Sequence, residues 1–373
     1  MKGYVRKRGS KWSYTVDVGK DPITGTRKQK TKSGFKTKKE AESALNQLVY
    51  EFNKGEWIAP KNVLLGEFAE EWIKSYRHRL RDTTAEQYEN KIRNWIGPLL
   101  GHYKVQELKP IHAQVFSGKL LESLNDNTVH KIHAITKLIL NHAVKLELIN
   151  KNPFNNLSLV KEQKRKVVTW SFDELEHFLK VVKNHHSFYY RIFVTAAYTG
   201  LRKGELLALK KDDIDWEKKR IKISKSVSET KKGVQLGELK TPSSHRNVAI
   251  DDFLISILKE QVIKNNEMKL KLGDSYNDQQ LIFCHEDGVV FRPSSLNRIF
   301  GRYIERSGSP KIRFHDLRHT HATLLLELGV NPKIVSDRLG HSSIKITLDT
   351  YSHVSLDLQS DVADVFSKRA RKA

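Results

Sequence analysis

Side chains suited to binding a phosphate diester recur through the second half of the chain. Arg202 is expected at a helix start, and Glu205 follows one turn later, where its carboxylate can hold the guanidinium in one orientation. Further on, His315 and Arg318 share one face of a second expected helix. Because arginine stays charged and donates paired hydrogen bonds, Arg202 and Arg318 could bind the non-bridging oxygens of a phosphate.

Three further residues could complete a site for transesterification. Lys240 lies close to Pro242 in an expected hairpin, and His341 follows a glycine. Tyr351 comes ten residues after His341. A phenol has a pKa of about 10 and is a poor nucleophile unless nearby cations favour the phenolate. In such a site His315 could accept the phenolic proton, His341 could donate to the phosphate, and Lys240 could protonate the departing 5′ oxygen.

The order Arg, Lys, His-x-x-Arg, His and Tyr resembles that of the tyrosine recombinases of the phage integrase family. The resemblance implies a catalytic set of Arg202, Lys240, His315, Arg318, His341 and Tyr351, with Glu205 in support of Arg202. It also implies that Tyr351 forms a 3′-phosphotyrosyl link with DNA and that strands are exchanged through a Holliday junction. The expected function is site-specific recombination that integrates and excises a mobile element. Since the covalent link stores the bond energy, neither ATP nor a metal cofactor is expected.

The resemblance further implies the partners and the setting of the reaction. The expected partner is double-stranded DNA with core-type and arm-type attachment sites, on which four copies of the chain assemble as a homotetramer. An excisionase and a host DNA-bending protein are plausible additional partners. The expected element is a phage or an integrative conjugative element, and the expected location is the cytoplasm of a bacterial host, in association with DNA.

Composition agrees with a polyanionic partner. The 373 residues carry 66 Lys and Arg against 43 Asp and Glu, a formal net charge of +23. With 38% hydrophobic residues the chain can build packed cores, and no apolar run approaches the roughly 18 residues of a membrane helix. The first residues lack the apolar region of a secretory signal, and the single cysteine, Cys284, cannot form an intramolecular disulfide. These features favour a soluble intracellular protein.

The sequence predicts a multidomain fold that begins with a small DNA-binding domain over residues 1–57. Trp12, Tyr14 and Val16 alternate with polar residues, as in a strand with one buried face. Turn-forming segments separate three short strands, and Thr37 with Glu40 forms a capping box that opens a helix. A three-stranded sheet backed by one helix would leave a basic face of a width that fits the DNA major groove.

An all-helical core-type DNA-binding domain is predicted over residues 63–157, followed by a basic linker over residues 158–167. The catalytic domain then takes residues 168–373, mixed α+β but mainly helical, and ends in an amphipathic tail helix. Within it, strands are expected at residues 220–223 and 246–250 on either side of a long basic hairpin, with a short strand at residues 281–283. Thr83 and Ser171 are predicted to cap helices, each with a glutamate three residues later.

Three other functions fit part of the pattern. A DNA-binding regulator would explain the positive net charge, but the order and spacing of Tyr351 and the other motif residues would then be a coincidence. A type IB topoisomerase shares the chemistry and relaxes supercoils without exchanging strands. A zinc site is suggested by His315 and His319, which are four residues apart, with His321 close by. Against it, the acid between the first two is aspartate rather than glutamate, and no further ligand is evident downstream.

Overall fold

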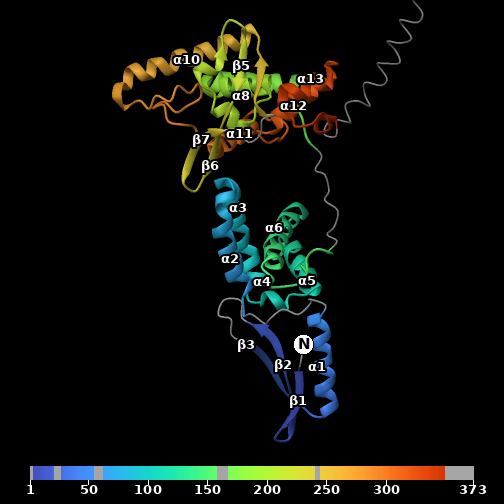
Figure 1. Cartoon of the computed structure of the whole chain (residues 1–373). Helices are drawn as coiled ribbons and strands as arrows, with labels where there is room; N and C mark the ends of the chain where they lie inside the picture. The colour runs from blue at the N-terminus through green and yellow to red at the C-terminus, as the bar shows by residue number, and fades with distance from the viewer. Residues whose placement is uncertain (1–2, 21–26, 54–61, 158–166, 240–243, 349–373) are drawn as a thin grey trace, which may run out of the picture. The chain divides into compact units, whose positions relative to one another are not determined.

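The chain is described by a computed structural model that covers residues 3–20, 27–53, 62–157, 167–239 and 244–348 (Figure 1). Contacts along the chain divide it into an amino-terminal unit, Met1–Gln163, and a carboxyl-terminal unit, Lys164–Ala373. Within the described ranges, no helix is both long and apolar enough to cross a bilayer.

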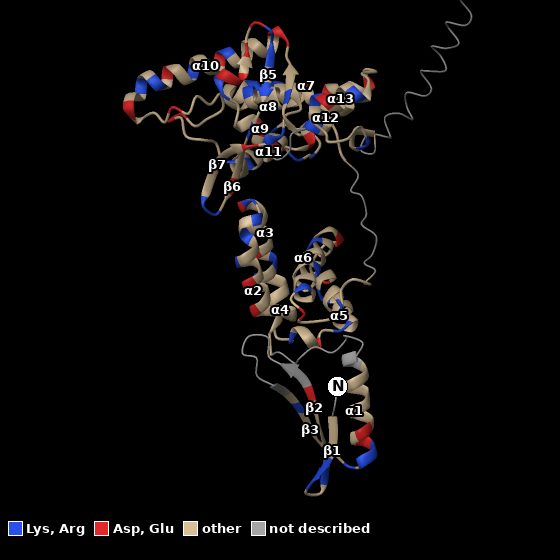
Figure 2. Ribbon diagram, viewed as in Figure 1, with Lys and Arg blue, Asp and Glu red and all other residues tan. Residues whose placement is uncertain are grey.

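The amino-terminal unit begins with a three-stranded antiparallel sheet backed by a helix, as predicted. The sheet has the order β1 (Gly3–Arg8), β2 (Lys11–Lys20) and β3 (Arg27–Phe35), and the helix is α1 (Lys38–Asn53). Tyr14 and Val16 pack with Leu45 and Leu48 of the helix to form a small core of their own. In the ribbon of Figure 2, Lys and Arg positions gather at the turn that joins β1 to β2.

The hydroxyl groups of polar residues in the central strand, β2, form hydrogen bonds within the sheet. The Thr15 hydroxyl lies 2.9 Å from that of Thr31, and the Ser13 hydroxyl donates to the Arg6 carbonyl over 3.2 Å. Ser13 and Thr15 are buried, as are Tyr14 and Val16, so the middle of β2 is shielded on both faces.

Residues 62–157 form a second, separate core made of helices. The main helices are α2 (Leu65–Tyr76), α3 (Asp82–Lys91), α4 (Gly97–Leu100), α5 (Pro110–Leu121) and α6 (Asp126–Lys145). The prediction that Thr83 caps a helix is wrong, because α3 already begins at Asp82 after Arg81. Asp82 is the first residue of α3, so its carboxylate lies at the positive end of the helix, where it is stabilised. Arg77 Nη2 also donates to this carboxylate over 3.3 Å.

The carboxyl-terminal unit packs helices around a large aromatic and aliphatic core that includes Trp170, Phe178, Phe193 and Phe300. Its helices are α7 (Phe172–His185), α8 (Ser187–Thr199), α9 (Lys203–Leu207), α10 (Asp252–Leu272), α11 (Pro293–Ser307), α12 (Asp316–Glu327) and α13 (Pro332–Leu339). Its strands are β4 (Ile214–Asp215), β5 (Arg220–Ile223), β6 (Lys225–Thr230), β7 (Gly233–Glu238) and β8 (Arg246–Ala249).

The strands of this unit form two sheets, and β5 and β8 come before and after the β6–β7 hairpin in the chain, as predicted. β4, β5 and β8 make an antiparallel sheet, and β6 and β7 make a two-stranded one. Leu281 makes a single bridge with Lys210, where a short strand was predicted. The hairpin lies against α9 because Gly204 leaves room for it: a Cβ there would fall 2.5 Å from the Val227 carbonyl oxygen.

The start of the unit is fastened to α12. Ser171 caps α7 as predicted, its hydroxyl accepting from the Glu174 amide over 3.2 Å while the glutamate accepts from the Ser171 amide over 2.9 Å. Beside it, the Trp170 indole donates to the Pro310 carbonyl over 2.8 Å, and the Trp170 amide donates to the Thr320 hydroxyl over 3.2 Å. This buried tryptophan therefore holds α7 and α12 together.

Replacing this anchor should weaken the carboxyl-terminal unit. We expect Trp170→Phe to lower the free energy of unfolding by about 1–3 kcal/mol, because it removes the indole donor and leaves a cavity. Urea unfolding of the full chain measures the loss. The matched control is Trp216→Phe, since Trp216 is only partly buried at the edge of the same core. Equal losses in the two variants would contradict the anchoring role.

Candidate active site

Arg202 is held by the carboxylate of Glu205. Arg202 is the residue that precedes α9, and its amide donates to Glu205 Oε2 over 2.9 Å. Its guanidinium Nη1 donates to Glu205 Oε1 over 2.8 Å, so both ends of the arginine bind one carboxylate. The Glu205 side chain is 1% exposed and that of Arg202 is 37% exposed. The pair therefore places a fixed guanidinium at the surface.

Arg318, in the first turn of α12, is buried and bonded to the ends of two other helices. Its Nη1 donates to the Gly200 carbonyl over 2.9 Å, and its Nη2 donates to the Leu339 carbonyl over 2.6 Å. Gly200 directly follows α8, and Gly340 directly follows α13; both adopt the left-handed conformation. The last carbonyls of a helix lack partners within it and carry partial negative charge, so a cation there is stabilised.

The close approach of these helices requires glycine at position 200. Its φ of +64° is rarely adopted by other residues, and a Cβ there would lie 2.6 Å from Leu339 Cδ2 and 2.8 Å from His321 Cδ2. The absence of a side chain lets α8 end directly against α12 and α13.

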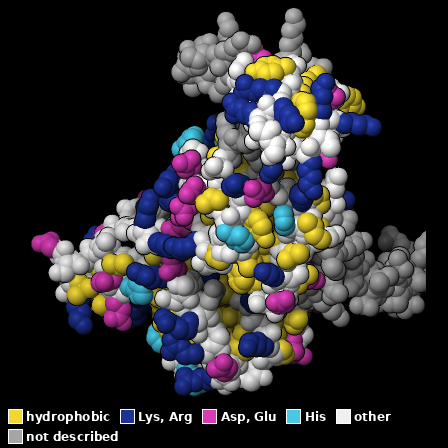
Figure 3. Space-filling view, turned by 90° about the horizontal axis from the view of Figure 1, so that it is seen from below, with side chains coloured by type: hydrophobic (Ala, Val, Ile, Leu, Met, Phe, Trp, Pro, Cys, Tyr) yellow, Lys and Arg dark blue, Asp and Glu magenta, His cyan; other side chains and the backbone are white. Residues whose placement is uncertain are grey.

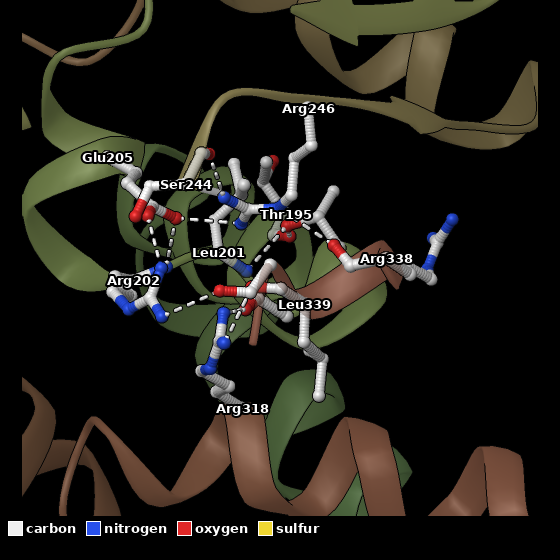
Figure 4. A network of polar contacts seen from close by, with 12 residues as sticks. Thr195, Leu201, Arg202, Glu205, Ser244, Arg246, Arg318, Arg338 and Leu339 are labelled. Atoms are coloured by element: carbon white, nitrogen blue, oxygen red, sulfur yellow. Dashed lines mark hydrogen bonds and ion pairs between the residues drawn. The ribbon is translucent and has the colours of Figure 1, made fainter. Parts of the chain in front are cut away.

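Three consecutive carbonyls at the end of α13 each accept from a different arginine (Figure 4). The Arg338 carbonyl accepts from Arg246 Nε over 2.8 Å, and the Leu339 carbonyl accepts from Arg318 Nη2. The Gly340 carbonyl accepts from Arg202 Nη2 over 3.2 Å. We call these three carbonyls the α13 carbonyl cluster. It gathers guanidinium groups from three separate parts of the chain immediately before His341.

Glu205 binds a second arginine on its buried side. Arg246 Nη2 donates to Glu205 Oε2 over 2.8 Å, and the Arg246 side chain is 5% exposed. Burial alone would raise the pKa of Glu205, but the hydrogen bonds and charges of Arg246 and Arg202 lower that pKa below its usual value. Glu205 therefore stays ionised and balances part of the positive charge that collects here.

His341 is held beside the two arginines as a neutral imidazole. Its Nδ1 lies 2.8 Å from the Thr347 hydroxyl, and its amide donates to the Ser336 carbonyl over 3.0 Å. Burial, followed by the charges of Arg318 and Arg202, lowers the pKa of His341 to about 4. When Nδ1 accepts from Thr347, the ring proton is on Nε2, which can then donate to an anion.

His315 immediately precedes α12 and is accessible to solvent. Desolvation by the surrounding protein, and then the charges of His319 and Arg318, lower the pKa of His315 to about 4, with Arg202 contributing in the same direction. Its ring meets that of His319 edge-on, with the centroids 5.2 Å apart. Because His315 is neutral above that pH, it can accept a proton.

The structure thus brings together Arg202, Glu205, Arg318 and His341. His315 is close enough for the charges of both arginines to lower its pKa. Lys240 and Tyr351 lie outside the described residues. Arg246, which the sequence analysis assigned only to a strand, belongs to the same network. Strand alternation could have indicated it, because Arg246 shares a side of β8 with the buried Val248.

The zinc alternative finds no ligand set in the part of the chain that the structure describes. No group of three or more His, Cys, Asp or Glu side chains there could hold a metal ion. His321, which the alternative needs as an additional ligand, instead accepts from Arg338 Nε through its Nε2 over 3.0 Å.

Sequence models of three protein families match successive parts of the chain. The model described as the phage integrase family matches residues 169–357. The model of an arm DNA-binding domain matches residues 4–51, and the model of the phage integrase N-terminal SAM-like domain matches residues 64–121.

Whole-chain relatives and solved structures agree with these matches. The tyrosine recombinase XerC-like protein of Caldanaerobacter subterraneus is 33% identical over 94% of this chain and 94% of its own length. The ICEBs1 integrase of Bacillus subtilis is 28% identical over 94% of this chain and 96% of its own. A structure of the Tn1549 transposon integrase with transposon right end DNA has a TM-score of 0.70 at 23% identity, covering 82% of this chain and 100% of that one. A lambda integrase tetramer bound to a Holliday junction has a TM-score of 0.59 at 18% identity, covering 93% of this chain and 94% of that one.

The Arg338 side chain joins α13 to α12, α8 and β8. Its Nη1 and Nη2 donate to the Ala249 and Tyr198 carbonyls, both over 2.9 Å, while Nε donates to His321. Burial, followed by the charge of Arg338, lowers the pKa of the buried His321 to about 3. A proton on Nε2 would face the guanidinium, so the folded protein requires neutral His321.

This requirement predicts a loss of stability in mild acid. The pKa of His321 lies below its usual value of 6.5, so between these values the unfolded chain binds a proton that the folded chain does not. Stability is therefore complete above pH 6.5 and falls as the pH drops, on the order of 2 kcal/mol from pH 7 to pH 5 for this residue. In His321→Gln, which can still accept from Arg338, urea unfolding should show that much less pH dependence. An unchanged dependence would contradict this assignment.

Proposed function

This chain belongs to the phage integrase family of site-specific tyrosine recombinases, and we propose that it integrates and excises a mobile element through a covalent link between Tyr351 and DNA. The proposed catalytic residues are Arg202, Lys240, His315, Arg318, His341 and Tyr351, with Glu205 orienting Arg202. Lys240 and Tyr351 are included in this set because of their positions in the sequence motif.

One observation carries the assignment of the site: Arg202 and Arg318 donate to neighbouring carbonyls of the α13 carbonyl cluster, directly before His341. Two fixed guanidinium groups and an imidazole donor at one point match the needs of a phosphate that gains negative charge in its transition state. Cleavage of a phosphodiester is extremely slow without such stabilisation, so preorganised charge must supply much of the rate.

The proposed reaction is a pair of transesterifications. The phenolic oxygen of Tyr351 attacks phosphorus while His315 accepts its proton, and the bond from phosphorus to the 5′ oxygen breaks as Lys240 protonates that oxygen. The product is a 3′-phosphotyrosyl link and a free 5′-hydroxyl. The 5′-hydroxyl of another strand then attacks the link and releases the tyrosine. Two such exchanges form and resolve a Holliday junction, and the bond energy is conserved throughout.

The remaining domains would deliver DNA to this site. Residues 1–57 would bind arm-type sites and residues 63–157 core-type sites, in keeping with the arm-binding and SAM-like matches. Residues 158–167 would link them to the catalytic residues 168–373. The lambda integrase tetramer on a Holliday junction supports a homotetramer on DNA. An excisionase and a host DNA-bending protein complete the proposed assembly, which would act in the cytoplasm of a bacterial host.

The covalent intermediate provides the direct test. A nicked duplex with the core site, taken from the DNA that flanks the gene, should trap the wild-type chain as a protein–DNA adduct on a denaturing gel. Tyr351→Phe should form no adduct and should bind the duplex with unchanged affinity, because only the attacking oxygen is lost.

The outcomes separate the candidate functions. A wild-type chain that binds the site without forming an adduct would be a DNA-binding regulator. Adduct formation and relaxation of supercoils without strand exchange between two sites would identify a type IB topoisomerase. An equal adduct yield from Tyr351→Phe would remove Tyr351 from the reaction.

DNA binding should depend strongly on salt. The chain has 66 Lys and Arg against 43 Asp and Glu, and Figure 3 shows many Lys and Arg side chains at the surface, so binding should use many separate phosphate contacts. Each contact displaces condensed counterions, and affinity should fall on the order of a thousandfold between about 50 and 200 mM salt. Electrophoretic mobility shifts at several salt concentrations give the slope. An affinity that stays nearly constant would exclude this mode of binding.

A further inference from the structure

We propose that Arg246 is a positioning residue of the recombination reaction, which fixes Arg202 and the His341 end of α13 relative to one another without touching DNA. The inference rests on the proposed function and extends it to a residue outside the family's motif positions named above.

Arg246 uses all three nitrogens of its guanidinium, and each binds a different part of the unit. Nη2 donates to Glu205 Oε2 over 2.8 Å, and Nε donates to the Arg338 carbonyl over 2.8 Å. Nη1 donates to the Ser244 carbonyl over 3.1 Å, which closes the turn that leads into β8. One planar group therefore joins α9, α13 and β8 (Figure 4).

The depth of the side chain separates its role from that of Arg202. Arg246 is 5% exposed and Arg202 is 37% exposed, although both bind the same carboxylate. Glu205 thus has an outer arginine at the surface and an inner arginine whose three guanidinium nitrogens all bond within the protein. A buried guanidinium of this kind is stable only because oxygen acceptors surround it. Any effect of Arg246 on the reaction must therefore come from how it positions those acceptors.

Two of these acceptors lead directly to proposed catalytic groups. Glu205 Oε2 also accepts from the Arg202 amide, so the carboxylate that Arg246 fixes is the one that orients Arg202. The Arg338 carbonyl lies two residues before Gly340, whose carbonyl binds Arg202, and three before His341. Without Arg246, Glu205 and the end of α13 lose one of the two arginines that join them, and Arg202, which must also bind the phosphate, is left to hold them together alone.

Two substitutions distinguish geometry from charge. Arg246→Lys keeps the charge but loses the planar set of three donors, and Arg246→Met loses both at similar length. With the nicked core-site duplex, we expect the rate of adduct formation to fall by at least roughly tenfold in Arg246→Lys and further in Arg246→Met. The dissociation constant for the duplex should stay within about twofold, because Arg246 does not contact DNA.

The titration of His341, followed by NMR, gives a second readout that needs no DNA. The charge of Arg246 contributes to the lowered pKa of His341. That pKa should rise in Arg246→Met and stay close to the wild-type value in Arg246→Lys. If both substitutions acted only by loosening the packing around the site, the pKa of His341 would change in the same way in both variants.

Arg338→Met is the matched control. Arg338 binds the Ala249 and Tyr198 carbonyls beside the same helix end, and its Nε donates to His321 rather than to Glu205. It should lower stability while leaving the adduct rate of the folded protein closer to wild type than either Arg246 variant does.

The outcomes keep this inference apart from the proposed function. If wild-type protein forms no adduct, the proposed function fails. If wild type reacts and both Arg246 variants react at the wild-type rate, only the positioning role of Arg246 is overturned. If Arg246→Met does not fold, the rate and DNA affinity of Arg246→Lys decide. Weaker DNA binding that accounts for all of the lost rate would likewise overturn the inference.

Discussion

A guanidinium group cannot lose its charge at any relevant pH, so each buried arginine must be surrounded by oxygen acceptors. In the carboxyl-terminal unit most of these acceptors are backbone carbonyls at the ends of α8 and α13, together with the carboxylate of Glu205. Helix ends supply such carbonyls because the last turn cannot satisfy them internally. The site therefore depends on where two helices stop, and Gly200 and Gly340 are the residues that stop them.

This arrangement assembles positive charge before any phosphate arrives. Arg202, Arg246 and Arg318 lie close together, and Glu205 is the carboxylate bonded to the first two. The remaining imbalance has a visible effect, since burial and the arginines lower the pKa values of His315 and His341. A phosphate would supply the missing negative charge and raise both pKa values. The same charges that disfavour protonated histidines would then stabilise an anionic transition state.

The sequence predicted features that depend on a few neighbouring residues, such as strands and helix caps. It did not predict contacts between helices and strands that are far apart in the chain. The Ser171 capping box lies within a few residues, and the structure confirms it. The predicted strand β2 also forms, with Tyr14 and Val16 packed on α1, but Ser13 and Thr15 on its other face are buried as well. Thr83 shows the limit, because the same capping pattern also fits inside a helix that starts one residue earlier. The α13 carbonyl cluster has no side-chain signature at all, since a backbone carbonyl is present at every position. The sequence assigned Arg246 only to a strand, and its bonds to Glu205 and to the Arg338 carbonyl became clear only from the structure.

Two kinds of positive charge in this chain must act differently on DNA. Exposed Lys and Arg side chains are screened by salt over about 10 Å, so they attract DNA from any direction and contribute affinity rather than geometry. The guanidinium groups of Arg246 and Arg318 at the end of α13 are fixed by short hydrogen bonds and are largely removed from water, so screening affects them little. A mobile lysine could neutralise a phosphate but could not hold the planar set of donors that an in-line displacement requires. Affinity and catalysis can therefore be altered separately: changes to surface charge should act on how much DNA is bound, and changes to the buried network should act on how fast bound DNA reacts.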